Sequence, residues 1–110
     1  GDAFVENINV GIEKLPKALT AEEYYQANAK NMRLAMPLFD EVSAADFRGK
    51  VAGKKMVYTW SANNRRMKVV AYFFTREKRG FVITGSAARD SYDRYAALFD
   101  RAAASFRWQK

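Results

Sequence analysis

Apolar and polar positions alternate near the start of the chain. One side of an extended chain over residues 4–12 would carry Phe4, Glu6, Ile8, Val10 and Ile12, and the other Val5, Asn7, Asn9 and Gly11. Four of the five positions on the first side are apolar. This alternation predicts a strand with one buried face.

Residues 20–36 follow a helical period instead. Thr20 is a favourable N-cap, and Glu23, three residues later, completes a capping box. Pro37 ends the pattern, because proline cannot continue a helix. Apolar or small side chains recur at helical spacing on one face, at Tyr25, Ala29, Met32 and Met36. We therefore expect an amphipathic helix here.

After a predicted break at residues 43–46, three strand patterns follow, at roughly 50–61, 66–76 and 81–85. Asn63-Asn64 suits a tight hairpin, and a charged turn over residues 77–80 leads to the third strand. Residues 69–74 are apolar at every position, which indicates that the middle strand is covered on both faces.

A second amphipathic helix is expected from about Asp90. Its apolar face would carry Tyr92, Tyr95, Ala96, Phe99, Ala103 and Phe106. The predicted order is strand, helix, three-stranded meander, helix. This order predicts an α+β domain spanning residues 1–110, with an antiparallel β-sheet covered by a helix on each face.

The net charge of +7 is concentrated in the middle third of the chain. Residues 48–79 hold ten basic residues and one acid, Glu77, for a charge of +9, which leaves −2 for the rest. The basic residues are Arg48, Lys50, Lys54, Lys55, Arg65, Arg66, Lys68, Arg76, Lys78 and Arg79. Such a segment favours an acidic partner, or serves solubility alone.

The chain contains neither cysteine nor histidine. Disulfides and thiol catalysis are excluded, and zinc sites and general-base catalysis lose their commonest residues. Asp40-Glu41, placed in a loop after Pro37, offers too few oxygens for a calcium site. We expect no enzyme activity, no metal and no cofactor. No stretch approaches the ~20 apolar residues of a membrane span.

The order of elements and several short motifs resemble the bacterial PsbP-like/DcrB-like family. The matching motifs are Asn7-Ile8-Asn9-Val10 in the first strand, Gly49 and Ala52 before the meander, and Ser105-Phe106 after the last helix. The resemblance implies an α/β/α sandwich. Family members usually begin with a further pair of strands, which is absent here. The chain is therefore either a fragment or a smaller sheet with a bare edge.

The resemblance also implies a non-enzymatic role in binding other proteins, as an adaptor or chaperone. Relatives of this fold include photosystem extrinsic subunits, envelope proteins and lipoproteins, secretion-effector chaperones and a nuclear-import factor. The resemblance favours the cell envelope or periplasm, and the cytoplasm stays open, as does the oligomeric state. It carries no catalytic residues over to this chain.

Three binding hypotheses follow from the residues. The first is an acidic protein surface on the end of the meander that carries Lys54, Lys55, Arg76, Lys78 and Arg79. The second is a nucleic acid, which could also use the opposite end with Arg65, Arg66 and Lys68. The third is a lipid or apolar ligand in a pocket lined by Trp60 and Tyr72. We expect the two basic ends to be separate surfaces, about 25–30 Å apart along one strand.

Overall fold

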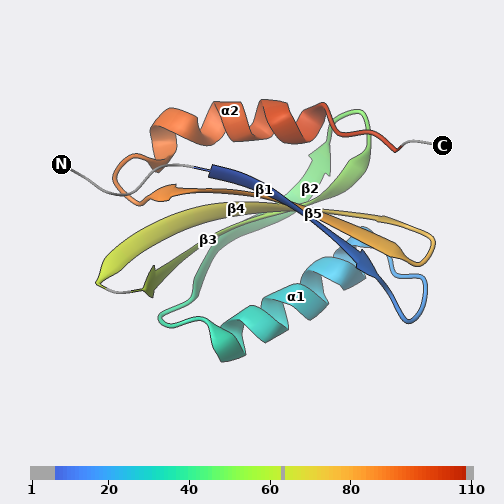
Figure 1. Cartoon of the computed structure of the whole chain (residues 1–110), viewed down its shortest axis with the longest axis horizontal. Helices are drawn as coiled ribbons and strands as arrows, with labels where there is room; N and C mark the ends of the chain where they lie inside the picture. The colour runs from blue at the N-terminus through green and yellow to red at the C-terminus, as the bar shows by residue number, and fades with distance from the viewer. Residues whose placement is uncertain (1–6, 63, 109–110) are drawn as a thin grey trace.

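Five antiparallel strands and two helices make up the computed structural model of the chain, which describes residues 7–62 and 64–108. The elements are β1 (Asn7–Lys14), α1 (Ala21–Ala35), β2 (Asp40–Arg48), β3 (Ala52–Ala62), β4 (Arg65–Arg76), β5 (Arg79–Ala88) and α2 (Tyr92–Ala104). The helices lie on opposite faces of the sheet (Figure 1). The α+β sandwich predicted from the sequence is confirmed.

The strands stand in the order β1-β5-β4-β3-β2. Consecutive hairpins join β2 to β5, and β1 pairs with β5 on the far side. Helix α1 therefore carries the chain from one edge of the sheet to the other (Figure 1). Both edge strands, β1 and β2, have one unpaired side within the described residues.

Helix α1 begins as its sequence predicts. The Thr20 hydroxyl accepts from the Glu23 backbone N–H at 3.0 Å, and the Glu23 carboxylate accepts from the Thr20 N–H at 2.9 Å. This reciprocal pair satisfies two N–H groups that a helix start otherwise leaves without partners. Tyr24, Tyr25 and Ala29 are the buried residues of the helix.

Strand β4 runs through the centre of the core. Residues 69–74 are each at most 3% exposed, so the prediction that both faces are covered is confirmed. Val69, Ala71 and Phe73 pack in the α1-side cluster, and the alternate residues Val70, Tyr72 and Phe74 pack in the α2-side cluster. A strand buried on both faces is apolar at every position because neither face meets water.

Strand β2 corrects the predicted break at residues 43–46 and the predicted loop at Asp40-Glu41. Most of β2 is exposed, so no apolar alternation marks it in the sequence. A register shift between Glu41 and Ser43 also interrupts the period of two. The sheet therefore has five strands rather than four. The predicted strand at 81–85 is also longer, since β5 covers Arg79–Ala88.

The prediction that the first strand buries its apolar face is wrong. Every residue of β1 is exposed, with Ile8 at 41%, Val10 at 60% and Ile12 at 72%. The adjacent strand β5 is covered, since Ile83, which lies opposite Val10, is buried in the α2-side core. Helix α2 covers β4 and β5 but leaves β1 uncovered. Residues 4–6 of the predicted strand lie outside the described residues.

Candidate functional site

Two of the five predicted contact residues, Lys54 and Lys55, neighbour each other on β3 and point to opposite faces of the sheet. The Lys54 ammonium lies 2.6 Å from Glu22 on α1 and 3.6 Å from Asp46 on β2. The Lys55 ammonium lies 2.9 Å from Asp100 on α2. Each lysine therefore ties a helix to the sheet. Neither presents an unpaired charge to a partner.

The other three predicted residues, Arg76, Lys78 and Arg79, gather where β4 turns into β5. Glu77 takes a positive φ of 55° in this tight turn. Arg76 and Arg79 line a cleft of about 550 Å³ with Arg107 from the segment that follows α2. Glu77, Phe81, Phe106 and Trp108 complete its lining. We call this cleft, lined by Arg76, Glu77, Arg79, Phe81, Phe106, Arg107 and Trp108, the Trp108 cleft.

The indole of Trp108 is held by two aromatic neighbours. Its ring lies edge-on to Phe81 at 4.6 Å between centroids and to Phe106 at 5.2 Å. Phe106 in turn stacks on the buried Phe74 at 4.5 Å. Trp108 is half-buried, so part of this large apolar side chain meets solvent from a fixed position. The chain after α2 is thereby anchored to the core.

Three arginines and one acid, Glu77, line the cleft beside this indole. The Arg76 guanidinium lies 5.8 Å from the Trp108 ring centroid, which is cation–π range. Within the described residues, Arg76, Arg79 and Arg107 form no ion pair with any carboxylate. The cleft therefore combines an anchored tryptophan with three arginines that remain available to an anion.

Lys78 lies on another side of the same turn. Together with Arg79 it lines a hollow of about 470 Å³ whose other lining residues are Lys14, Leu15 and Glu77. Arg79 borders both this hollow and the Trp108 cleft. The basic surface of this end therefore continues from Arg107 across the turn to Lys14.

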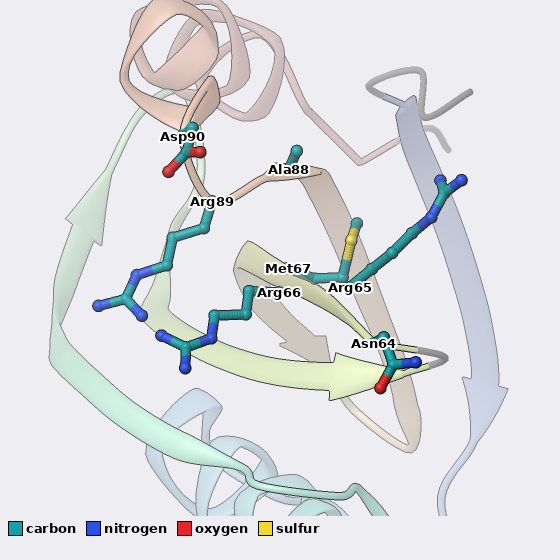
Figure 2. A pocket seen from close by; sticks show the side chains of 7 residues that line it. All are labelled: Asn64, Arg65, Arg66, Met67, Ala88, Arg89 and Asp90. Carbon is teal, nitrogen blue, oxygen red and sulfur yellow. The ribbon is translucent and has the colours of Figure 1, made fainter. Parts of the chain in front are cut away.

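The second predicted cluster lies at the opposite end of β4, and Figure 2 shows two of its residues, Arg65 and Arg66. Arg65 and Arg66 line a hollow of about 650 Å³ together with Asn64, Met67, Ala88, Arg89 and Asp90. The side chains of Arg66 and Arg89 extend in the same direction, whereas Arg65 extends the other way (Figure 2). Lys68 lies apart from them, with its ammonium 4.9 Å from the Tyr92 ring centroid. We call the hollow of about 650 Å³, which Lys68 does not line, the Arg89 hollow.

Sequence reasoning missed Arg89, Arg107 and Trp108 as site residues. Arg89 could have been found from strand register, because Met67 pairs with Ala88 and the next position of the same ladder places Arg66 beside Arg89. The backbone confirms the continuation, since the Arg89 N–H donates to the Arg66 carbonyl at 3.0 Å. Nothing in the sequence marks Arg107 and Trp108, because their position depends on where the chain leaves α2.

The predicted pocket between Trp60 and Tyr72 is wrong. Trp60 packs against the α1-side cluster, whereas Tyr72 is fully buried in the α2-side cluster. The sheet itself separates the two side chains, so they cannot line one pocket. Trp60 instead borders a small hollow of about 130 Å³ with Arg66 and Arg89.

Tyr72 takes part in a polar network beneath α2. Its hydroxyl donates a hydrogen bond to Asp100, and the same carboxylate accepts from Lys55 at 2.9 Å. Burial and the Asp100 carboxylate raise the pKa of the Tyr72 phenol far above its usual value. Tyr72 is therefore a protonated hydrogen-bond donor at any physiological pH, and its role is structural.

In residues 7–62 and 64–108, no group of acidic, histidine or cysteine side chains is arranged to hold a metal ion. The helices of this part of the chain are also too short or too polar to cross a membrane.

Solved structures with a similar fold include a bacterial and a cyanobacterial protein. A Pseudomonas aeruginosa protein of unknown function is 16% identical, with a TM-score of 0.73 over 99% of this chain and 88% of that protein. The PsbP protein of Synechocystis, CyanoP, is 20% identical, with a TM-score of 0.64 over 94% of this chain and 68% of that protein. No family model and no curated protein matches the sequence. At these identities the likeness concerns the fold alone, and it confirms that the chain adopts the PsbP-like fold.

Proposed function

We propose that this domain is a non-enzymatic protein-binding module whose Trp108 cleft receives an acidic segment of a partner. The observation that carries the proposal is the position of Trp108, anchored by Phe81 and Phe106 among three arginines that form no ion pair within the described residues. An adaptor or chaperone role fits this fold, since residues 69–74 at the centre of the sheet are buried on both faces and leave binding to the surface.

The composition of the cleft matches the chemistry of protein interfaces. Tryptophan, tyrosine and arginine are enriched among the residues that contribute most binding energy, and such residues lie in well-packed pockets of the interface. A guanidinium also pairs with a carboxylate through two parallel hydrogen bonds. Arg76, Arg79 and Arg107 therefore suit aspartate or glutamate side chains, while the indole of Trp108 suits an adjoining apolar side chain.

A nucleic acid is the second candidate, and the Arg89 hollow favours it. Arg66 and Arg89 extend in the same direction and border Trp60, so phosphates and a stacked base would both find partners there. This reading predicts affinity that falls steeply with salt, because each neutralised phosphate releases a counterion. The two candidates use opposite ends of β4, which makes them separable by mutation.

Affinity capture from native lysate with three forms of the protein tests the proposal. The forms are the wild type, Arg76→Glu/Arg79→Glu and Arg65→Glu/Arg66→Glu, and the two variants change the net charge equally. We expect a stoichiometric partner that survives nuclease and is lost only with the Arg76→Glu/Arg79→Glu form. Material lost to nuclease, and lost with Arg65→Glu/Arg66→Glu, would replace the proposal with nucleic-acid binding.

A further inference from the structure

The exposed edge of β1 differs in kind from the other edge of the sheet. Natural proteins protect sheet edges with charges, proline or bulges, because an unprotected edge pairs with other strands. Strand β2 has such protection, with a bulge between Glu41 and Ser43 and charged residues along its length. Strand β1 is regular over Asn7–Lys14, has no proline, and carries charge only at its last two residues, Glu13 and Lys14.

The free backbone groups of β1 can be assigned from its ladder with β5. The Leu15 N–H donates to the Lys78 carbonyl at 2.7 Å, and this pair continues the register in which Lys14 faces Arg79. Hydrogen-bonded and non-bonded pairs alternate along an antiparallel ladder. The odd-numbered residues of β1 therefore bond inward to β5. The N–H and C=O groups of Ile8, Val10 and Ile12 point outward to the open edge.

The side chains of those same three residues form an apolar stripe. Ile8, Val10 and Ile12 are 41%, 60% and 72% exposed, and they lie on the α2 side of the sheet because Val10 faces Ile83 across the ladder. The edge thus offers outward hydrogen-bonding groups and exposed apolar side chains at the same positions. A strand that pairs here would satisfy both.

We propose that β1 pairs antiparallel with β1 of a second copy of this chain, with Val10 on the two-fold axis. In this register Val10 faces Val10, and Ile8 faces Ile12, so each of these three outward positions meets an apolar one. About six backbone hydrogen bonds form between the outward groups of these residues. On the opposite face Asn7 meets Glu13 and Asn9 meets Gly11, so no like charges stand opposite each other.

The charge of the β1 edge fits a second copy, and the small contact area sets the affinity of the pair. The chain carries +7, yet Glu13 and Lys14 cancel within β1, so the two copies approach along a neutral edge. The two-fold places both α2 helices on one side of the joined sheet, with the apolar stripes between them. Stable interfaces bury roughly 1,200–2,000 Å² in total, and a single strand pair buries less. We therefore expect a weak dimer, with a Kd of roughly tens of micromolar.

Sedimentation of the wild type across roughly 10 µM to 1 mM tests the association. The mass should rise from 12.5 kDa toward twice that value as concentration increases. Val10→Lys should stay monomeric, because it places two charges at the axis. Val42→Lys is the matched control, since Val42 is 52% exposed on the other edge strand, and this variant should dimerise like the wild type. A wild type that remains monomeric throughout would overturn the proposal, as would a dimer that Val10→Lys leaves intact.

Cysteine cross-linking tests the register, because the chain has no cysteine of its own. Val10→Cys should form a disulfide-linked dimer with itself under mild oxidation, much faster than Val42→Cys. Ile8→Cys and Ile12→Cys should cross-link to each other when mixed, in preference to themselves. Equal rates for Val10→Cys and Val42→Cys would contradict the pairing. So would a monomer whose Ile8, Val10 and Ile12 amides resist hydrogen exchange, since another segment of the same chain would then cover the edge.

Discussion

The phenol of Tyr72, at the centre of β4, donates a hydrogen bond to the carboxylate of Asp100 on α2. The same carboxylate accepts two hydrogen bonds from Lys55 on β3, at 2.9 and 3.1 Å. One acid thereby joins a helix to two strands. Tyr72 is fully buried, so its hydroxyl depends on this partner.

Replacing Asp100 should therefore lower the free energy of unfolding. Asp100→Ala leaves the buried Tyr72 hydroxyl without an acceptor, and we expect a loss of about 1–3 kcal/mol in the free energy of unfolding. Asp100→Asn keeps an acceptor oxygen, so its free energy of unfolding should fall by less. Urea unfolding monitored by circular dichroism measures both. Asp46→Ala is the control, because Asp46 is an 85% exposed partner of Lys54 and should cost at most about 1 kcal/mol. Equal losses for Asp100→Ala and Asp46→Ala would contradict the account.

Gly85 on β5 provides the space for Phe99 of α2. A Cβ atom at Gly85 would lie 2.6 Å from two atoms of the Phe99 ring, which is buried and cannot move away freely. Gly85→Ala should therefore destabilise the fold by about 1–3 kcal/mol through overpacking. Gly11→Ala is the matched control, because nothing lies within 4 Å of the added atom there. If the Gly85→Ala and Gly11→Ala variants have the same melting temperature, α2 does not pack on Gly85 as described.

The buried tyrosines predict a loss of stability in alkali. Burial raises the pKa of Tyr58 to about 12, whereas a tyrosine in the unfolded chain titrates near 10. The unfolded state ionises first, so the contribution of Tyr58 is complete below about pH 10 and disappears by about pH 12. That contribution is about 2–3 kcal/mol. Unfolding in urea between pH 9 and 12 should show a shallower decline for Tyr58→Phe than for the wild type, and parallel declines would refute this assignment.

Trp108 should be the residue on which partner binding depends most. Trp108→Ala removes the apolar centre of the cleft and the ring beneath Arg76, and we expect at least a tenfold weakening of partner binding, the effect of a typical hot-spot residue. Trp60→Phe is the control, because Trp60 lies at the other end of the molecule, beside Arg66. Isothermal titration with the captured partner measures both variants. If the Trp108→Ala variant binds with wild-type affinity, the indole is not part of the binding site.

The sequence predicted those elements whose signals are local. Thr20 and Glu23 mark the start of α1 because a capping box is a contact between residues three apart. The apolar run of residues 69–74 marks the central strand because both of its faces are buried. These features depend little on the rest of the fold.

The missed features depend on contacts far along the chain. Strand β2 lies at an edge, where exposure and a bulge leave no pattern to detect. The alternation of β1 is real, but its apolar face is exposed because α2 does not reach it. Likewise, Lys54 and Lys55 do not belong to the predicted basic patch, because they form ion pairs with Glu22 and Asp100. These acids lie close to the lysines only in the folded protein. Arg107 and Trp108, near the end of the chain, line the same cleft as Arg76 and Arg79.

Fluorescence titration of Trp108 in a Trp60→Phe background tests the central proposal most directly. The ligand is a tryptophan-free peptide of about twelve residues rich in glutamate and leucine, matched to the charge and apolar character of the cleft. Arg76→Glu/Arg79→Glu should weaken binding by tenfold or more, whereas Arg65→Glu/Arg66→Glu, with the same net charge, should stay within about twofold. Equal weakening by both variants would contradict a specific site at the Trp108 cleft and leave only general attraction between an acidic peptide and a basic protein.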